Sequence, residues 1–158
     1  MSNSYHLNGI QQMGIGVPDV QDIWTWYRKA FGMDVRIFEE AAPAPLMTRY
    51  TGGEVQHRTA TLAINMAGGG GFEIWQFTSR PTVKATFEPQ LGDYGVFICK
   101  IKSEDVCHTQ KHLQQMGANV SPAQQDPAGR WTCYVQDPNG NYFQIVEGRS
   151  WFASSQHP

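Results

Sequence analysis

An internal repeat constrains the fold of this chain more than any other feature of its sequence. The segments "QQMGIGVPDVQDIWTWYRKAFGMDV" and "VFICKIKSEDVCHTQKHLQQMGANV" share one layout: a short alternating strand, a helix that ends at a glycine, and a valine three residues further on. From the end of the strand to that glycine is 15 residues in the first segment, Val17 to Gly32, and 16 in the second, Ile101 to Gly117. Self-similarity of this kind predicts two copies of one supersecondary unit.

The ends of the two helices can be placed from capping residues. Asp19 is expected to cap the first helix at its N-terminus, with Asp22 at the third helical position. Ser103 is expected to cap the second helix, because two acidic residues that suit the positive end of a helix dipole follow it directly. Gly32 and Gly117 suit the left-handed position that follows a helix.

Three strands are predicted after each helix. They are "DVRIFEE", "HRTATLAIN" and "FEIWQFT" in the first half, and "NVSPA", "WTCYVQ" and "NYFQIVE" in the second. The last pair is joined by "DPNG", a tight turn in which Asn139 or Gly140 takes the left-handed corner. Residues 41–56 are expected to form an insertion that is too rich in Pro and Gly for a core strand. The sequence thus predicts an α+β fold: one domain, 1–158, of two β-α-β-β-β modules at 8–78 and 92–148.

Composition and charge exclude several classes of function. The net charge is −2 and no Lys/Arg-rich run occurs, so we expect no nucleic-acid partner. We expect no membrane partner either, because no apolar stretch has the length of a membrane span and "MSNSYHLNGI" lacks the apolar core of a signal peptide. The three cysteines form no CxxC pair, which favours reduced thiols in a cytoplasmic protein.

The order and spacing of "GVPDV", "WYRKAFGMDV" and "YVQDPNGNYFQIVE" closely resemble the vicinal oxygen chelate superfamily, over roughly residues 8–148. This superfamily includes glyoxalase I, extradiol dioxygenases and the metal-free bleomycin-resistance proteins. The resemblance implies that each module curls into a half-barrel and that paired modules form a cleft, where a divalent metal usually sits. It also implies a homodimer, in which modules are sometimes exchanged between chains.

Four positions match the metal ligands of the glyoxalase-like members. They carry Gln12, Glu73, Val96 and Gln144 in this chain. Transition metals prefer imidazoles and carboxylates, whereas this set offers one carboxylate, two neutral amides and one side chain without a donor. We therefore expect no resident cofactor and at most a weak divalent metal. Replacing Val96 with His and Gln144 with Glu is expected to restore metal binding.

Strand alternation predicts which side chains face the cleft. Phe72 and Ile74 are expected to pack under the first helix, so their neighbours in the strand point the other way. The cleft is then aromatic and apolar with a few polar groups, as small-molecule pockets are. The predicted ligand-binding residues are Gln12, Trp75, Phe77, Tyr142 and Gln144, and Glu73 is the candidate catalytic residue.

Three functions remain open at this level, and the sequence leaves open whether the protein is an enzyme. The first is a small-molecule-binding protein with a degenerate metal site and an apolar or aromatic ligand. The second is a divergent lyase, isomerase or dioxygenase that uses a weak metal, or Glu73 as an acid/base. The third is a structural or regulatory module with a filled barrel. Gly16 and Phe77 stand where glyoxalases hold glutathione, so the resemblance does not extend to lactoylglutathione lyase.

Overall fold

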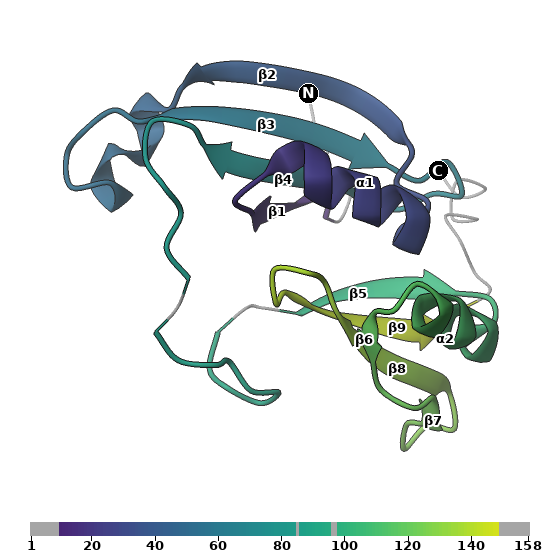
Figure 1. Ribbon diagram of the computed structural model, residues 1–158. Helices are drawn as coiled ribbons and strands as arrows, with labels where there is room; N and C mark the ends of the chain where they lie inside the picture. The colour runs from purple at the N-terminus through teal and green to yellow at the C-terminus, as the bar shows by residue number, and fades with distance from the viewer. Residues whose placement is uncertain (1–9, 85, 96–97, 149–158) are drawn as a thin grey trace, which may run out of the picture.

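The computed structural model describes residues 10–84, 86–95 and 98–148. None of the helices among these residues is long and apolar enough to cross a membrane. Figure 1 shows the elements in two groups along the chain. The first group is β1 (Gln12–Gly16), α1 (Val20–Phe31), β2 (Val35–Pro43), the 3-10 helix η1 (Pro45–Tyr50), β3 (His57–Ile64) and β4 (Gly71–Phe77). The second is β5 (Ile98–Ser103), α2 (Val106–Gln115), β6 (Asn119–Val120), β7 (Gln124–Gln125), β8 (Trp131–Gln136) and β9 (Tyr142–Glu147).

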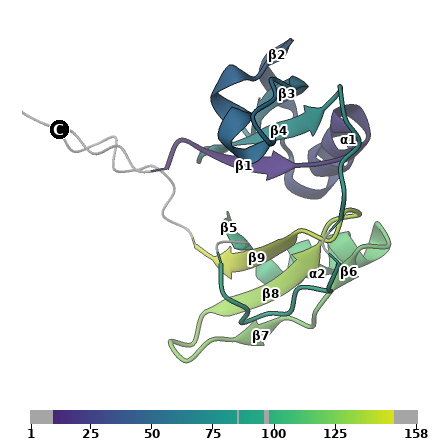
Figure 2. The ribbon, with the colours of Figure 1, turned by 90° about the vertical axis from the view of Figure 1, so that its left-hand side faces the viewer.

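The strands form two separate mixed sheets with matching topology. The first has the order β1-β4-β3-β2 and the second the order β5-β9-β8-β6, with β7 paired to β8. In both sheets the first strand lies parallel to the last, and the other neighbours are antiparallel. Figure 2 shows the sheets as two layers. The predicted α+β class is confirmed. The first half has the β-α-β-β-β order, and in the second half two short strands, β6 and β7, both paired with β8, stand in place of the first strand after the helix.

The first helix is capped as predicted, but the second is capped by a different residue. The Asp19 carboxylate accepts a hydrogen bond from the Asp22 N–H at 2.9 Å. The prediction of Ser103 as the second cap is wrong, because Ser103 is still part of β5 and the helix begins at Val106. Asp105 caps α2 by accepting from the His108 N–H at 2.8 Å.

Glycines occupy the left-handed positions that the sequence predicts. Gly32 follows α1 with φ 63° and Gly117 follows α2 with φ 76°. In the β8–β9 turn Gly140 takes φ 90°, and its N–H donates to the Asp137 carbonyl at 3.0 Å. Residues with a Cβ rarely adopt this backbone region, so glycine fixes where each helix ends and where this turn closes.

The predicted insertion at 41–56 begins too early. β2 continues through Ala41 and Ala42 to Pro43, which pairs with His57 of β3. β2 is an edge strand with one neighbour, so the missing N–H of Pro43 costs no hydrogen bond of the ladder. The remainder of the insertion holds η1, which packs no buried side chain.

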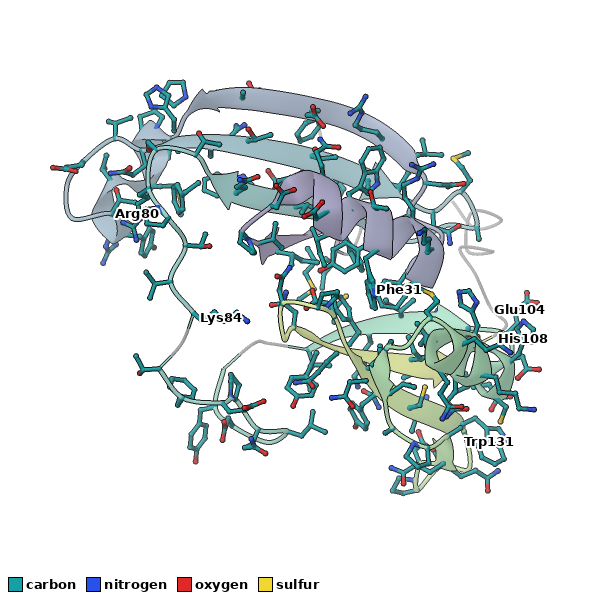
Figure 3. All side chains as sticks on the ribbon, viewed as in Figure 1. Phe31, Arg80, Lys84, Glu104, His108 and Trp131 are labelled. Carbon is teal, nitrogen blue, oxygen red and sulfur yellow. The ribbon has the colours of Figure 1, made fainter. Side chains whose placement is uncertain are left out.

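One hydrophobic core joins the two sheets, and α1, which lies beside the first sheet (Figure 1), supplies several of its residues. The Tyr27 ring meets Phe72 of the first sheet at 5.2 Å and Phe143 of the second at 5.7 Å. Phe31, labelled in Figure 3, meets the same two rings at 6.1 and 5.1 Å. Phe72 and Phe143 are themselves 5.6 Å apart. Residues from the helix-facing sides of both sheets therefore meet in one core, and the side chains that alternate with them lie on the opposite faces.

Candidate functional site

The face of the first sheet that points away from the core carries the predicted site residues. Phe72 and Ile74 of β4 are 2% and 0% exposed and belong to the core beneath α1, as predicted. Glu73, Trp75 and Phe77 alternate with them and are only half-buried. Period-two alternation thus separates packing residues from candidate site residues on this strand.

Gln12 and Glu73 meet on this face. β1 lies parallel to β4 with Gln12 opposite Gly71 and Gly14 opposite Glu73. The Gln12 side-chain N–H donates to Glu73 Oε2. A Cβ added at Gly14 or Gly16 would meet nothing within 4 Å, so the surface beside this pair is open. The Glu73 carboxylate is therefore held in place while its surroundings leave room for a ligand.

Trp75 and Phe77 form an aromatic pair flanked by two guanidinium groups. Their ring centroids are 5.3 Å apart at an interplanar angle of 81°. Arg58 lies over Trp75 with its Cζ 5.6 Å from the centroid, and Arg80 lies over Phe77 at 5.5 Å. Arg58 is also bound to Glu40 at 2.6 Å. Strand alternation could have found Arg58, which pairs with Phe77 across β3 and β4, but Arg80 lies beyond the strand.

The aromatic pair opens into a hollow of about 920 Å³. This hollow lies between the end of β4, the linker that follows it (residues 79–92) and the β8–β9 turn. The linker runs well away from both sheets (Figure 1). Gln12, Glu73, Tyr142 and Gln144 do not line it. Its walls are Gly16, Val17, Pro18, Trp75, Phe77, Arg80, Thr82, Val83, Lys84, Thr86, Phe87, Glu88, Pro89, Gln136, Asn139, Gly140 and Asn141.

A buried carboxylate fixes the β8–β9 wall of this hollow. Asp137 is 5% exposed, and its Oδ1 accepts from the backbone N–H groups of Asn139 and Asn141, both at 2.8 Å. Its Oδ2 accepts from the Tyr27 hydroxyl at 2.6 Å and from Asn141 Nδ2 at 2.8 Å. Burial, reinforced by the charge of Asp137, raises the pKa of Tyr27 far above its ordinary value. The turn is thereby tied to α1.

Gln144 and Tyr142 lie on the second sheet, on the face away from the core. Their neighbours Phe143 and Ile145 are each 1% exposed and belong to the core. Gln144 Nε2 donates to Thr132 Oγ1 at 3.0 Å, and that hydroxyl donates to the Ile145 carbonyl at 2.8 Å. Among the described residues, the side chain of Gln12 is thus hydrogen-bonded to Glu73 and that of Gln144 to Thr132.

Within one chain the predicted site residues therefore form two groups. Gln12, Glu73, Trp75 and Phe77 share the outer face of the first sheet, and Tyr142 and Gln144 share that of the second. Val96, the remaining position of the predicted ligand set, lies outside the described residues.

The family model of the Glyoxalase/Bleomycin resistance protein/Dioxygenase superfamily matches residues 9–145. The chain belongs to this superfamily. None of the curated proteins matches it in sequence. A glyoxalase family protein of Bacillus cereus is similar in structure, with a TM-score of 0.71 and 16% identity, covering 93% of this chain and 98% of that one.

Two further solved structures, of proteins with different functions, share the fold. TnmS3, an antibiotic binding protein from Streptomyces sp. CB03234, gives a TM-score of 0.59 at 15% identity and covers 92% of this chain and 100% of its own. The trypanothione-dependent glyoxalase I of Leishmania major gives 0.58 at 14% identity, covering 89% and 87%. At these identities the similarity establishes the fold, and function depends on the site.

The residues of the site do not fit the divalent metal that many members of the superfamily hold. Glu73 is the one carboxylate of the set, and the side-chain nitrogens of Gln12 and Gln144 are turned to Glu73 and Thr132. A dication needs more negative charge or imidazole donors than one carboxylate and two amides supply. Among the described residues, no group of three or more His, Cys, Asp and Glu is arranged to hold a metal ion.

Proposed function

We propose that this protein binds a small, flat, apolar or aromatic molecule against Trp75 and Phe77 without the help of a metal. The observation that carries the proposal is the edge-to-face aromatic pair that forms one wall of the 920 Å³ hollow. Hollows of this size, with aromatic walls and a few polar groups, suit small molecules. Gln12, Glu73 and Gln144 stand at positions that hold a metal in relatives, and two amides with one carboxylate favour a binding role over metal-dependent chemistry. An antibiotic binding protein also shares the fold.

Calorimetric titration of chelator-treated protein with 2-naphthamide tests this proposal. We expect saturable binding that added zinc does not change. Replacing Trp75 with Ala should weaken it about 10-fold or more, because a stacked ring contributes both apolar contact and an aromatic pair. Trp131→Ala is the matched control, since Trp131 is 39% exposed and lies far from the hollow (Figure 3). Equal binding by both variants would refute the proposed site.

We further propose that two copies of the chain pair, so that the outer face of a first sheet meets that of the partner's second sheet. The two modules, 8–78 and 92–148, would then belong to one domain whose cleft is completed by dimerisation. In support, the outer faces point away from the shared core, and Gly14 and Gly16 leave the first one open. Light scattering should give a dimer across the micromolar range, and a monomer throughout that range would contradict the arrangement.

A second candidate function is metal-independent acid/base catalysis by Glu73. The hydrogen bond from Gln12 to this half-buried carboxylate favours it, because a positioned carboxylate beside open space can exchange a proton with a ligand. Mass spectrometry of a bound compound after incubation separates the two functions. A binding protein returns the compound unchanged, whereas catalysis by Glu73 alters it and Glu73→Gln abolishes the change.

We also propose a cytoplasmic location. Cys99, Cys107 and Cys133 are all free thiols, which a reducing compartment maintains. Burial raises the pKa of Cys133 to about 11, so this thiol stays protonated and unreactive.

A further inference from the structure

We propose that the ligand is an aromatic acid: its ring lies against Trp75 and Phe77, and its anionic group faces the cations Arg80 and Lys84, which line the same hollow. The aromatic half of this inference rests on the proposed function, and the anionic half rests on the charges that line the hollow. Both cations lie on the linker after β4 (Figure 3). Lys84 extends from the linker toward the space that the linker encloses (Figure 3).

Arg80 and Lys84 are the basic residues that line the hollow, and among the described residues no ion pair to an acidic side chain involves them. The ion pairs among the described residues join Arg36 to Glu39 at 2.9 Å, Arg58 to Glu40 at 2.6 Å and Arg130 to Asp126 at 2.8 Å. Neither Arg80 nor Lys84 takes part in any of them. A ligand anion can therefore approach these cations without displacing a paired carboxylate of the protein.

The local charge of the hollow has the opposite sign to that of the whole chain. Arg80 and Lys84 line it with Glu88 as the one acidic side chain, whereas the chain carries a net charge of −2. A cleft with one sign of charge attracts small molecules of the other sign. Two cations suit one carboxylate or sulfonate, and they are too few to follow a nucleic-acid backbone.

The aromatic and cationic groups are adjacent, so one small molecule can reach both. The Cζ of Arg80 is 5.5 Å from the Phe77 centroid, which places a guanidinium at the edge of the aromatic pair. The opposite wall is the turn that Asp137 holds rigid, with Asn139 and Asn141 on it. A planar ring that carries one acidic group matches this arrangement. The ring can pack on the aromatic pair while the acidic group faces the cations, and the polar turn lies opposite.

Titrations of the full chain with 2-naphthoate and 2-naphthamide test the inference, since the two probes share a ring system and differ in charge. In the double variant Arg80→Gln/Lys84→Gln we expect 2-naphthoate to bind about 10-fold more weakly, because two charge-assisted contacts are lost. Binding of 2-naphthamide should stay unchanged. Lys29→Gln/Lys111→Gln is the control: it removes the same charge from exposed helical positions and should leave both probes unaffected.

The outcomes separate this inference from the proposed function. If the double variant and the control bind 2-naphthoate equally, the anionic half is overturned, whether or not Trp75→Ala weakens both probes. If Trp75→Ala leaves both affinities unchanged, the aromatic floor and the proposed function are overturned, even where 2-naphthoate still depends on Arg80 and Lys84. Added salt should weaken 2-naphthoate more than 2-naphthamide, because screening acts on the charged contacts.

Discussion

The two sheets share a strand order but differ on the faces that point away from the core. On the first, the side chains of Gln12 and Glu73 are hydrogen-bonded to each other, beside glycines that leave open space. On the second, Gln144 is tied to the buried hydroxyl of Thr132. The comparison indicates that packing fixes the inner face of each module, while the outer faces are free to differ. The proposed ligand-binding groups Trp75, Phe77, Arg80 and Lys84 lie on the first sheet and on the linker after it.

The outer edges of the sheets differ as well. β2 is continuous over nine residues, whereas the second sheet has β6 and β7 of two residues each in the corresponding place. Pro122 lies between these fragments and has no N–H for a ladder. The side chain of Ser121 compensates in part, because its Oγ accepts from the Tyr134 N–H at 3.0 Å. The second sheet thus ends in an irregular edge.

The largest effect is expected where the two halves meet. Phe143→Ala should lower the free energy of unfolding by about 3–5 kcal/mol, since it removes a buried ring packed on Tyr27, Phe31 and Phe72. Fluorescence and circular dichroism should follow one denaturant transition. Leu46→Ala is the control, because Leu46 is 91% exposed. Two separate transitions would mean that the halves do not share a core.

A smaller effect is expected at the link between α1 and the β8–β9 turn. Tyr27→Phe removes the hydroxyl that donates to Asp137 at 2.6 Å and should cost about 1–3 kcal/mol near neutral pH. Burial raises the pKa of Tyr27, so the folded phenol stays protonated above pH 10, where an unfolded tyrosine ionises. Its contribution to stability is therefore complete below about pH 10 and falls as pH rises further.

Urea unfolding of the wild type and of Tyr27→Phe at about pH 8 and about pH 11 measures this dependence. The stability difference between the two proteins should shrink at the higher pH, because the variant lacks the phenol whose ionisation is linked to unfolding. A difference that stays constant would contradict the linkage of Tyr27 to folding.

The smallest effect separates Gln144 from an exposed glutamine, Gln11. Gln144→Glu should cost about 1 kcal/mol, because a carboxylate cannot donate to Thr132 Oγ1, whose own hydrogen bonds to the Ile145 carbonyl. The exposed Gln11→Glu should change stability by no more than about 0.5 kcal/mol. Equal stability of the two variants in urea unfolding would show that the Thr132 contact does not hold Gln144.

Strand alternation and glycine positions made much of the fold predictable. Phe72 and Ile74 lie in the core because period two decides which side chains of a strand pack under the helix. Gly32 and Gly117 mark the helix ends because the left-handed backbone region favours glycine. These are local rules, so one sequence suffices for them. The second cap was mispredicted because Ser103 and Asp105 are both good capping residues, and the length of β5 decides between them.

The candidate site was less predictable because it depends on how distant elements pack. Alternation places Trp75 and Gln144 on outer faces, but it does not show that the two sheets turn those faces away from a common core. The approach of the linker, with Arg80 and Lys84, to the β8–β9 turn is likewise a tertiary feature without a local pattern. Asp137 appeared as a turn residue only, and its bond to Tyr27 spans 110 positions of the sequence.

The metal content of the protein, purified without a chelator and measured by elemental mass spectrometry, tests the central claim most directly. The account predicts far less than one equivalent of zinc, nickel, iron or manganese, because Glu73 is the one negative charge among Gln12, Glu73, Val96 and Gln144. Glu73→Ala serves as the control and should have the same low content. Close to one equivalent in the natural protein, lost in Glu73→Ala, would contradict a metal-free binding protein.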